Sequence, residues 1–147
     1  MAAAGDDVRS LERLLRHRYG ELVEDITADE SFVTRRTFGC LSCYLHGRLK
    51  LALAEGRAHW DGVLVATAKE HHASLRRTVA ALRPHPVLGK WLYLAASGDS
   101  FEDDARRLAA LALADDPRIG VEPTPRRERA RGRRTRSRTR AHRRRSA

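Results

Sequence analysis

Two cysteines and a histidine lie close together in TFGCLSCYLHG, residues 37–47. Cys40 and Cys43 have the C-x-x-C spacing, and His46 follows three positions later. Thiolate and imidazole groups at short spacing are typical zinc ligands, and C-x-x-C is also typical of thiol–disulfide chemistry. The third interpretation is a β-hairpin that contains two thiols with no chemical task.

The residues around the cysteines favour the hairpin. Leu41, Cys43 and Leu45 alternate with more polar neighbours, which predicts a strand with Cys40 and Cys43 on opposite faces. Cys40 and His46 would share a face, but six residues of extended chain separate them by ~20 Å. Redox C-x-x-C pairs lie at the starts of helices and not within strands. We therefore predict no metal ion and no redox cofactor here.

A second run of alternating leucines follows the first, and the two runs restrict the hairpin register. Both sets of leucines face one side only if an odd number of residues separates the paired positions. A three-residue loop, residues 45–47, meets this condition. It predicts that Cys43 lies opposite Leu49 and that Leu41 lies opposite Leu51.

His71 and His72 are adjacent, with Glu70 before them and Asp61 nearby in the sequence. Such a group suggests a metal or acid–base site. The spacing differs from H-E-x-x-H, however, and neighbouring histidines on a helix point ~100° apart. We favour histidines that are solvated or hydrogen-bonded at the edge of a helix.

Trp60, Trp91 and Tyr93 supply much of the aromatic content. Trp91 and Tyr93 alternate with leucines, which favours packing in or beside the core. The alternative is a ligand-binding face that combines Lys90, Trp91 and Tyr93 with the His71/His72 pair. The sequence has no nucleophile elbow, phosphate-binding glycine loop or dinucleotide fingerprint. We therefore predict no catalytic residues and no cofactor.

Five elements would position these residues. Residues 7–19 predict an amphipathic helix, residues 31–68 predict short strands joined by glycine-containing turns, and residues 69–83 predict a second helix. Residues 90–96 predict another strand, and Ser100 caps a final helix. This order favours an α+β fold, in which an antiparallel meander is covered by an N-terminal helix and two later helices. The expected buried positions on the helices are Val8, Leu11, Leu14, Leu15, Tyr19, Leu75, Val79, Leu82, Phe101, Ala105, Leu108 and Ala112.

The formal charge of +10 resides entirely in the C-terminal segment. Residues 1–121 contain 17 of the 29 basic and 17 of the 19 acidic residues, so their net charge is zero. We predict one domain over residues 1–121 and a disordered tail over residues 122–147, because the tail has too few apolar residues to offset its ordering entropy. The tail contains 12 arginines: Arg126, Arg127, Arg129, Arg131, Arg133, Arg134, Arg136, Arg138, Arg140, Arg143, Arg144 and Arg145.

An arginine-rich tail attracts polyanions through counterion release. It lacks aromatic side chains for stacking on bases, so we expect DNA or RNA binding with little sequence preference. The alternative is a solvated tail without a selected partner. The RSRTR segment, residues 136–140, could also accept phosphate, which would reduce the positive charge.

The body resembles the N-terminal domain of the TfoX/Sxy family of bacterial competence regulators. TRRTFGC (34–40) is similar to the family's R-x-M-F-G-G segment, with Thr37 and Cys40 as departures. YLHGRLKLAL (44–53) resembles the following hairpin, and residues 90–114 resemble the closing strand and helix. The resemblance implies a non-enzymatic regulatory or binding module that contacts a protein partner.

The chain starts with neither a basic segment nor an apolar run, and no apolar stretch approaches the ~18 residues of a membrane span. We therefore expect a cytoplasmic protein with reduced thiols and no membrane contact.

Overall fold

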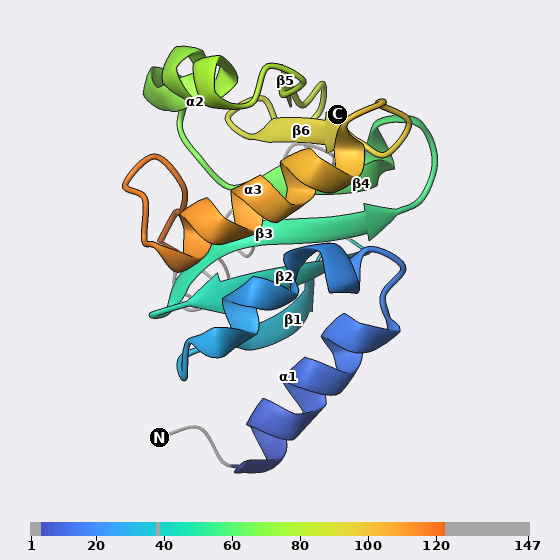
Figure 1. Cartoon of the computed structure of the whole chain (residues 1–147), viewed down its shortest axis with the longest axis vertical. Coiled ribbons are helices and arrows are strands. Elements are labelled where there is room, and N and C mark those ends of the chain that lie inside the picture. The colour runs from blue at the N-terminus through green and yellow to red at the C-terminus, as the bar shows by residue number, and fades with distance from the viewer. Residues whose placement is uncertain (1–3, 38, 123–147) are drawn as a thin grey trace, which may run out of the picture.

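The computed structural model describes the backbone of residues 4–37 and 39–122, with side chains from residue 8 onward (Figure 1). The predicted tail therefore lies outside the described residues, apart from Glu122. Six antiparallel strands form one sheet in the order β1-β2-β3-β4-β6-β5. The strands are β1 (Val33–Thr37), β2 (Cys40–Leu45), β3 (Arg48–Glu55), β4 (Asp61–Val65), β5 (Arg83–Pro84) and β6 (Leu92–Ala95).

Helices cover one face of this sheet. The helix α3 (Phe101–Leu113) crosses the sheet, and the 3₁₀ segment η1 (Gly20–Ala28) packs beside it (Figure 1). The first helix, α1 (Ala4–Arg16), packs against β1. The helix α2 (His72–Thr78) lies at the opposite end of the molecule, near β5 and β6. Two short 3₁₀ turns, η2 (Ala58–Trp60) and η3 (Lys69–His71), complete the described elements.

The strands alternate as the sequence predicts, so the sheet has apolar side chains on both faces. The helix-covered face joins Leu41, Leu53 and Leu94 to the apolar side of α3 in the main core. The other face carries a smaller cluster of Cys40, Ala52, Ala54, Leu64 and Tyr93. The α+β prediction is confirmed, with an antiparallel sheet and helices packed on it.

The predicted helices differ in how much of their apolar faces they bury. Phe101, Ala105, Leu108 and Ala112 face the core from α3, as expected. The second helix ends at Thr78, but its predicted positions are still buried, two of them in the following turn. Sequence analysis missed β5, whose two residues form an edge strand beside β6.

The prediction for the first helix is wrong at three of its five apolar positions. Leu14 is buried and Tyr19 is nearly so, but Val8, Leu11 and Leu15 are exposed. The helix lies at the margin of the fold, where the backbone amide of Thr34 donates to the hydroxyl oxygen of Ser10 at 3.0 Å. Because α1 contacts the sheet through its edge strand, only a narrow side of the helix reaches the core.

The predicted hairpin register is also wrong. The turn has two residues, His46 and Gly47, both with positive φ, and Leu45 pairs with Arg48. Two residues with positive φ are typical of a type I′ turn, which matches the twist of a hairpin. Cys43 pairs with Leu51 instead of Leu49, and Leu41 pairs with Leu53 instead of Leu51.

A β-bulge, and not a three-residue loop, provides the one-residue shift in register that the alternating leucines require. Tyr44 pairs with Leu49, whereas its neighbour Cys43 pairs with Leu51. Lys50 is therefore the extra residue on β3. The bulge lets Leu51 and Leu53 face the main core together with Leu41 and Cys43, although the loop is one residue shorter than predicted. Leu49 pairs with Tyr44 instead and lies outside the main core.

Candidate functional site

The two thiols lie on opposite faces of the sheet. Cys43 belongs to the main core and Cys40 to the smaller cluster, and both are buried. Burial raises the pKa of the Cys43 thiol to about 12 and also raises that of Cys40. The predicted separation is confirmed, and neither thiol is in the electropositive, exposed setting that activates cysteine.

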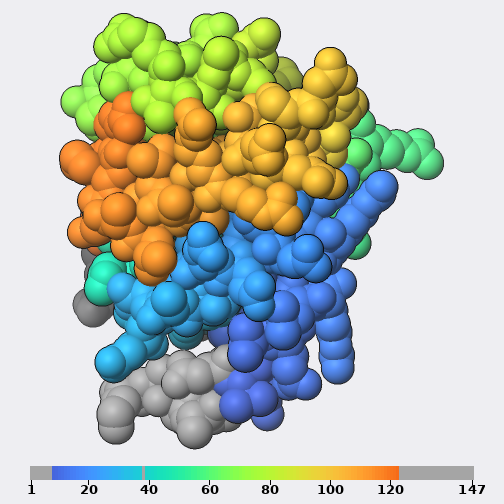
Figure 2. All heavy atoms as spheres, in the orientation of Figure 1, coloured from blue at the N-terminus to red at the C-terminus, as the bar shows by residue number. Residues whose placement is uncertain are grey.

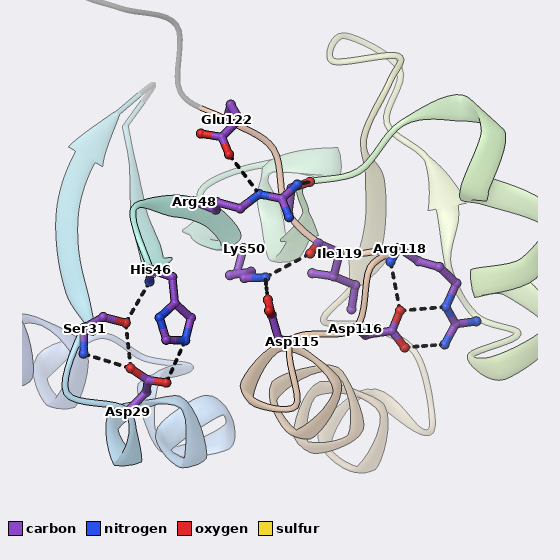
Figure 3. Close-up of polar contacts among 11 residues, drawn as sticks. Asp29, Ser31, His46, Arg48, Lys50, Asp115, Asp116, Arg118, Ile119 and Glu122 are labelled. Carbon is purple, nitrogen blue, oxygen red and sulfur yellow. Dashed lines mark hydrogen bonds and ion pairs between the residues drawn. The ribbon is translucent and has the colours of Figure 1, made fainter.

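His46 has a local partner instead of a cysteine. Its Nε2 lies 3.0 Å from Asp29, and its backbone amide donates to the hydroxyl of Ser31 at 2.7 Å (Figure 3). Hydrogen bonds from Ser31 hold the pKa of Asp29 below its usual value, and His46 adds to this effect. These contacts fasten the β2–β3 turn to the segment before β1. Within the described part of the chain, no group of three or more His, Cys, Asp or Glu residues is placed to hold a metal ion.

The bulged residue Lys50 makes an ion pair that sequence analysis missed. Its side chain is fully buried, and its Nζ donates to Asp115 at 2.7 Å and to the carbonyl oxygen of Ile119 at 3.2 Å (Figure 3). The hydrogen bond from Lys50 holds the pKa of Asp115 below its usual value. The sequence signal is a lysine inside RLKLALA, where the neighbouring positions are apolar.

Further contacts fix the chain after α3. Arg48 donates to the carbonyl oxygen of Gly120 at 2.8 Å and lies 3.5 Å from Glu122. Leu49 and Val121 form an antiparallel bridge with two backbone hydrogen bonds of 3.0 Å. Through this bridge, the backbone pairing of β3 continues with Val121 beyond the point where its pairing with β4 ends. We call the contacts of Arg48 and Lys50 with residues 115–122 the C-terminal clasp.

Arg118 connects the same segment to α2. Its guanidinium group forms two hydrogen bonds to the carboxylate of Asp116, at 2.8 and 2.9 Å. It also donates to the hydroxyl groups of Ser74 and Thr78, each at 3.0 Å. The bond from Arg118 holds the pKa of Asp116 below its usual value. The segment that leads into the arginine-rich tail is thus fixed at both β3 and α2.

The aromatic residues of the alternative ligand face lie with the smaller cluster. Tyr93 is buried, and its hydroxyl donates to the carbonyl oxygens of Asp61 at 2.7 Å and Ala58 at 3.0 Å. Trp60 and Trp91 are half-buried against the same cluster. The Tyr93 hydroxyl is therefore occupied by the turn before β4, which agrees with packing beside the core.

The other residues of that alternative face lie at α2. His72 Nε2 lies 2.8 Å from the carbonyl oxygen of Lys90, while the Lys90 side chain is exposed. His71 is at the end of η3 and half-buried. The contact at His72 agrees with a hydrogen-bonded histidine at a helix edge and ties the loop before β6 to α2.

His85 is a buried histidine that sequence analysis did not single out. Its ring packs 4.4 Å from Trp60 and 4.9 Å from His59, measured between centroids. Its Nδ1 accepts hydrogen bonds from the amides of Val87 and Leu88, which assigns the proton of the neutral ring to Nε2. Burial lowers the pKa of His85, and the nearby His59 lowers it further. His85 therefore stabilises a turn as a neutral side chain.

A hollow of about 540 Å³ lies between η1, the start of β4 and the start of α3. The Tyr19 hydroxyl bonds to Asp61 at its wall. Burial raises the pKa of Tyr19 to about 12, and the bond to Asp61 acts in the same direction. Arg18, Glu21 and Glu102 also line the hollow. The hollow is therefore lined by both basic and acidic side chains, and this mixture of charges does not indicate one class of ligand.

No family model, curated protein or solved structure matches the chain. No helix in the described part of the chain has both the length and the apolar character for a membrane crossing.

Proposed function

We propose that this protein is a non-enzymatic binding module whose arginine-rich tail gives it a nonspecific affinity for nucleic acid. The observation that carries the proposal is the distribution of charge. Residues 1–121 are electrically balanced, and all of the +10 charge follows them. A polycationic segment joined to a neutral domain is suited to hold phosphate backbones while the domain contacts another partner.

The C-terminal clasp supports the proposal that the domain and the tail have separate binding roles. Arg48 and Lys50 fix the last described residues, so the tail starts from a defined point on the domain. We propose further that the domain is related to the TfoX N-terminal domain and contacts a protein partner in the cytoplasm. The antiparallel hairpin at residues 40–55 and the closing strand and helix at residues 92–113 agree with the segments that carry the resemblance.

The experiment is to remove residues 123–147 and to measure binding to DNA and RNA over a range of salt concentrations. For the whole chain, we expect log K to fall by ~0.9 for each duplex phosphate neutralised per decade of salt. The truncated chain should lose most of this slope. Circular dichroism of the truncated chain controls for folding, because every described helix and strand precedes the cut. An unchanged affinity and slope would refute the role of the tail.

A further inference from the structure

The electrically balanced domain has a strongly basic end. Residues 69–90 contain five basic residues and one acidic residue, Glu70. All five basic side chains are exposed. We call them the α2-lobe cations: Lys69, Arg76, Arg77, Arg83 and Lys90.

The α2-lobe cations are available to an outside partner. The ion pairs of the described residues use other basic groups, namely Arg16, His17, His46, Arg48, Lys50, Arg106 and Arg118. Arg83 donates to the carbonyl oxygens of Ala80 and Leu82, both at 3.0 Å, which orients its guanidinium group without neutralising it. An anion that meets this surface therefore has no internal carboxylate to displace.

The fold brings these cations to one end of the molecule. The helix α2 and the strands β5 and β6 lie together at the top of Figure 1, and the segment around α2 forms a continuous green surface at the top of Figure 2. Arg83 pairs with Tyr93 across β5 and β6, and His72 is bonded to the carbonyl oxygen of Lys90. These contacts join β5 to β6 and α2 to the loop before β6, so the segments that carry the cations are connected to one another.

The adjoining surface has an excess of acidic groups, although it also carries Arg106, which pairs with Glu21 at 3.9 Å. Residues 20–32, which include η1, contain five acidic residues and no basic residue. Residues 99–104, at the start of α3, contain four more acidic residues. Because η1 packs along α3, these groups flank one another on the helix-covered face. A polyanion is repelled by this face and attracted by the α2 lobe, so the charge pattern orients its approach.

The chain leads from this basic end directly toward the tail. Arg118 is bonded to Ser74 and Thr78 of α2, and Glu122 lies only four positions later in the chain. Four extended residues span at most ~14 Å. The tail thus begins close enough to α2 for both to contact one nucleic acid. Two linked contacts raise the effective concentration of the second one.

From this geometry we infer that the α2-lobe cations form a second contact surface, which docks on the phosphate backbone of the nucleic acid held by the tail. This inference rests on the proposed function and adds a defined surface and orientation to it. A duplex presents one negative charge per ~1.7 Å of its axis, so several of the five cations can meet phosphates together. Phosphate contacts position a protein and carry no sequence information, which fits binding without sequence preference.

The test uses the full chain and fluorescently labelled 20-base-pair duplexes of DNA and of RNA with the same sequence. One variant combines Arg76→Gln with Arg77→Gln. The matched control combines Arg35→Gln with Arg36→Gln, which removes the same charge from two adjacent, exposed arginines on β1, at the far edge of the sheet. Fluorescence anisotropy gives the affinity and its salt slope, and a thermal melt checks that each variant folds.

We expect the α2 variant to bind about tenfold more weakly, with a salt slope lower by about 1 for each lost phosphate contact. The β1 control should change much less. If the α2 variant melts early, Lys69→Gln with Lys90→Gln replaces it, because these two cations lie outside the helix itself. Equal losses in the α2 and β1 variants would refute the inference, since only overall charge would then matter.

A third variant, in which the 12 tail arginines are glutamine, separates the two proposals. A large loss in this variant and none in the α2 variants leaves the tail proposal intact and overturns the docking surface. The reverse result overturns the role of the tail, and with it the docking on nucleic acid that the tail holds, and leaves the α2 lobe as a phosphate contact that acts without the tail. Vesicles of phosphatidylserine serve as another polyanion. Binding to the vesicles and to neither duplex would overturn both proposals.

Discussion

The ammonium group of Lys50 lies 2.7 Å from a carboxylate oxygen of Asp115, 65 residues later in the chain. The two partners differ in their surroundings, because the Lys50 side chain is 0% exposed and the Asp115 side chain is 62% exposed. The charged end of a fully buried lysine therefore depends on a carboxylate that also contacts solvent. Burying an ammonium group without a partner is strongly unfavourable.

This asymmetry predicts unequal effects of the two single substitutions. Asp115→Asn should lower the free energy of unfolding, because it leaves the buried ammonium group without its carboxylate. Asparagine tolerates the positive φ of 59° at this position, so the variant tests charge and not backbone strain. Lys50→Met keeps the apolar stem and removes the charge, so its effect should be smaller.

Chemical denaturation of the two single variants and the double variant measures these effects. The double variant should regain much of the stability that Asp115→Asn loses, because no ammonium group then remains buried. A Lys50→Met variant that is less stable than Asp115→Asn would contradict this account of the clasp.

The buried neutral state of His85 predicts a pH dependence. Its pKa is lowered in the folded protein, so the unfolded chain, with a histidine pKa near 6.5, takes up the proton first as the pH falls. The contribution of His85 to stability is therefore present above pH ~6.5 and is lost below it, by at most ~1.4 kcal/mol per pH unit. The rings of His59, Trp60 and Tyr93 pack against the ring of His85.

His85→Asn is the matched variant, because its side-chain oxygen can accept the amides of Val87 and Leu88 without titrating. Denaturation at pH 7.5 and pH 5.5 should show a smaller loss of stability for the variant than for the unchanged protein. His17, whose pKa is also lowered by burial, remains in both proteins and cancels in the comparison. Identical losses in the two proteins would remove His85 as a cause.

Two glycines with positive φ differ in the space around them, so an alanine is strained at both positions and overlaps a neighbouring strand only at Gly62. Gly47 has φ of 75° in an open turn, whereas a Cβ added at Gly62 would lie 2.0 Å from the carbonyl oxygen of Leu94. We expect Gly47→Ala to lower the free energy of unfolding by about 1–2 kcal/mol through its left-handed conformation. Gly62→Ala should have a larger effect, because β4 and β6 must also move apart. Urea unfolding of the two variants gives the comparison, and a milder effect at Gly62 would contradict the close strand contact.

The buried thiols predict slow chemical modification. Cys43 is 0% exposed, and burial raises its pKa to about 12, so in the folded protein its thiol is both inaccessible and protonated at pH 8. Brief alkylation of the folded protein, followed by mass spectrometry, should leave Cys43 unmodified. Alkylation in guanidinium chloride should modify both cysteines. Rapid modification of Cys43 under native conditions would show that the hairpin opens readily.

Zinc binding gives a separate test of the same hairpin. Because the thiols of Cys40 and Cys43 lie on opposite faces of the sheet, we expect no zinc bound jointly by the two. Metal analysis that gave one zinc per chain, lost in both Cys40→Ser and Cys43→Ser, would contradict this arrangement.

Sequence patterns predicted the elements better than their pairing. Alternating leucines placed Cys40 and Cys43 on opposite faces, because side-chain direction in a strand depends only on neighbouring residues. The register between β2 and β3 depends on the number of residues in the loop plus the number of extra residues in any bulge. A three-residue loop and a two-residue loop with a bulge at Lys50 give the same parity, so the pattern of leucines cannot distinguish them.

The clasp was not predicted, and the burial of Val8, Leu11 and Leu15 on α1 was predicted wrongly, for a different reason. The partner of Lys50 is 65 residues away, and no local pattern relates such positions. The apolar face of α1 predicts that its residues are buried. How much of that face contacts the core, however, depends on where the helix packs against the rest of the domain. Because α1 meets only the margin of the sheet, Leu11 and Leu15 remain exposed.

The short edge strand β5 has a consequence for crowded solutions. Pro84 has no amide hydrogen, and β5 is only two residues long, so this edge offers little for a strand of a second molecule to pair with. At the other edge, β1 carries Arg35 and Arg36, which would bring like charges together if two such edges met. Both margins of the sheet therefore resist growth into fibrils.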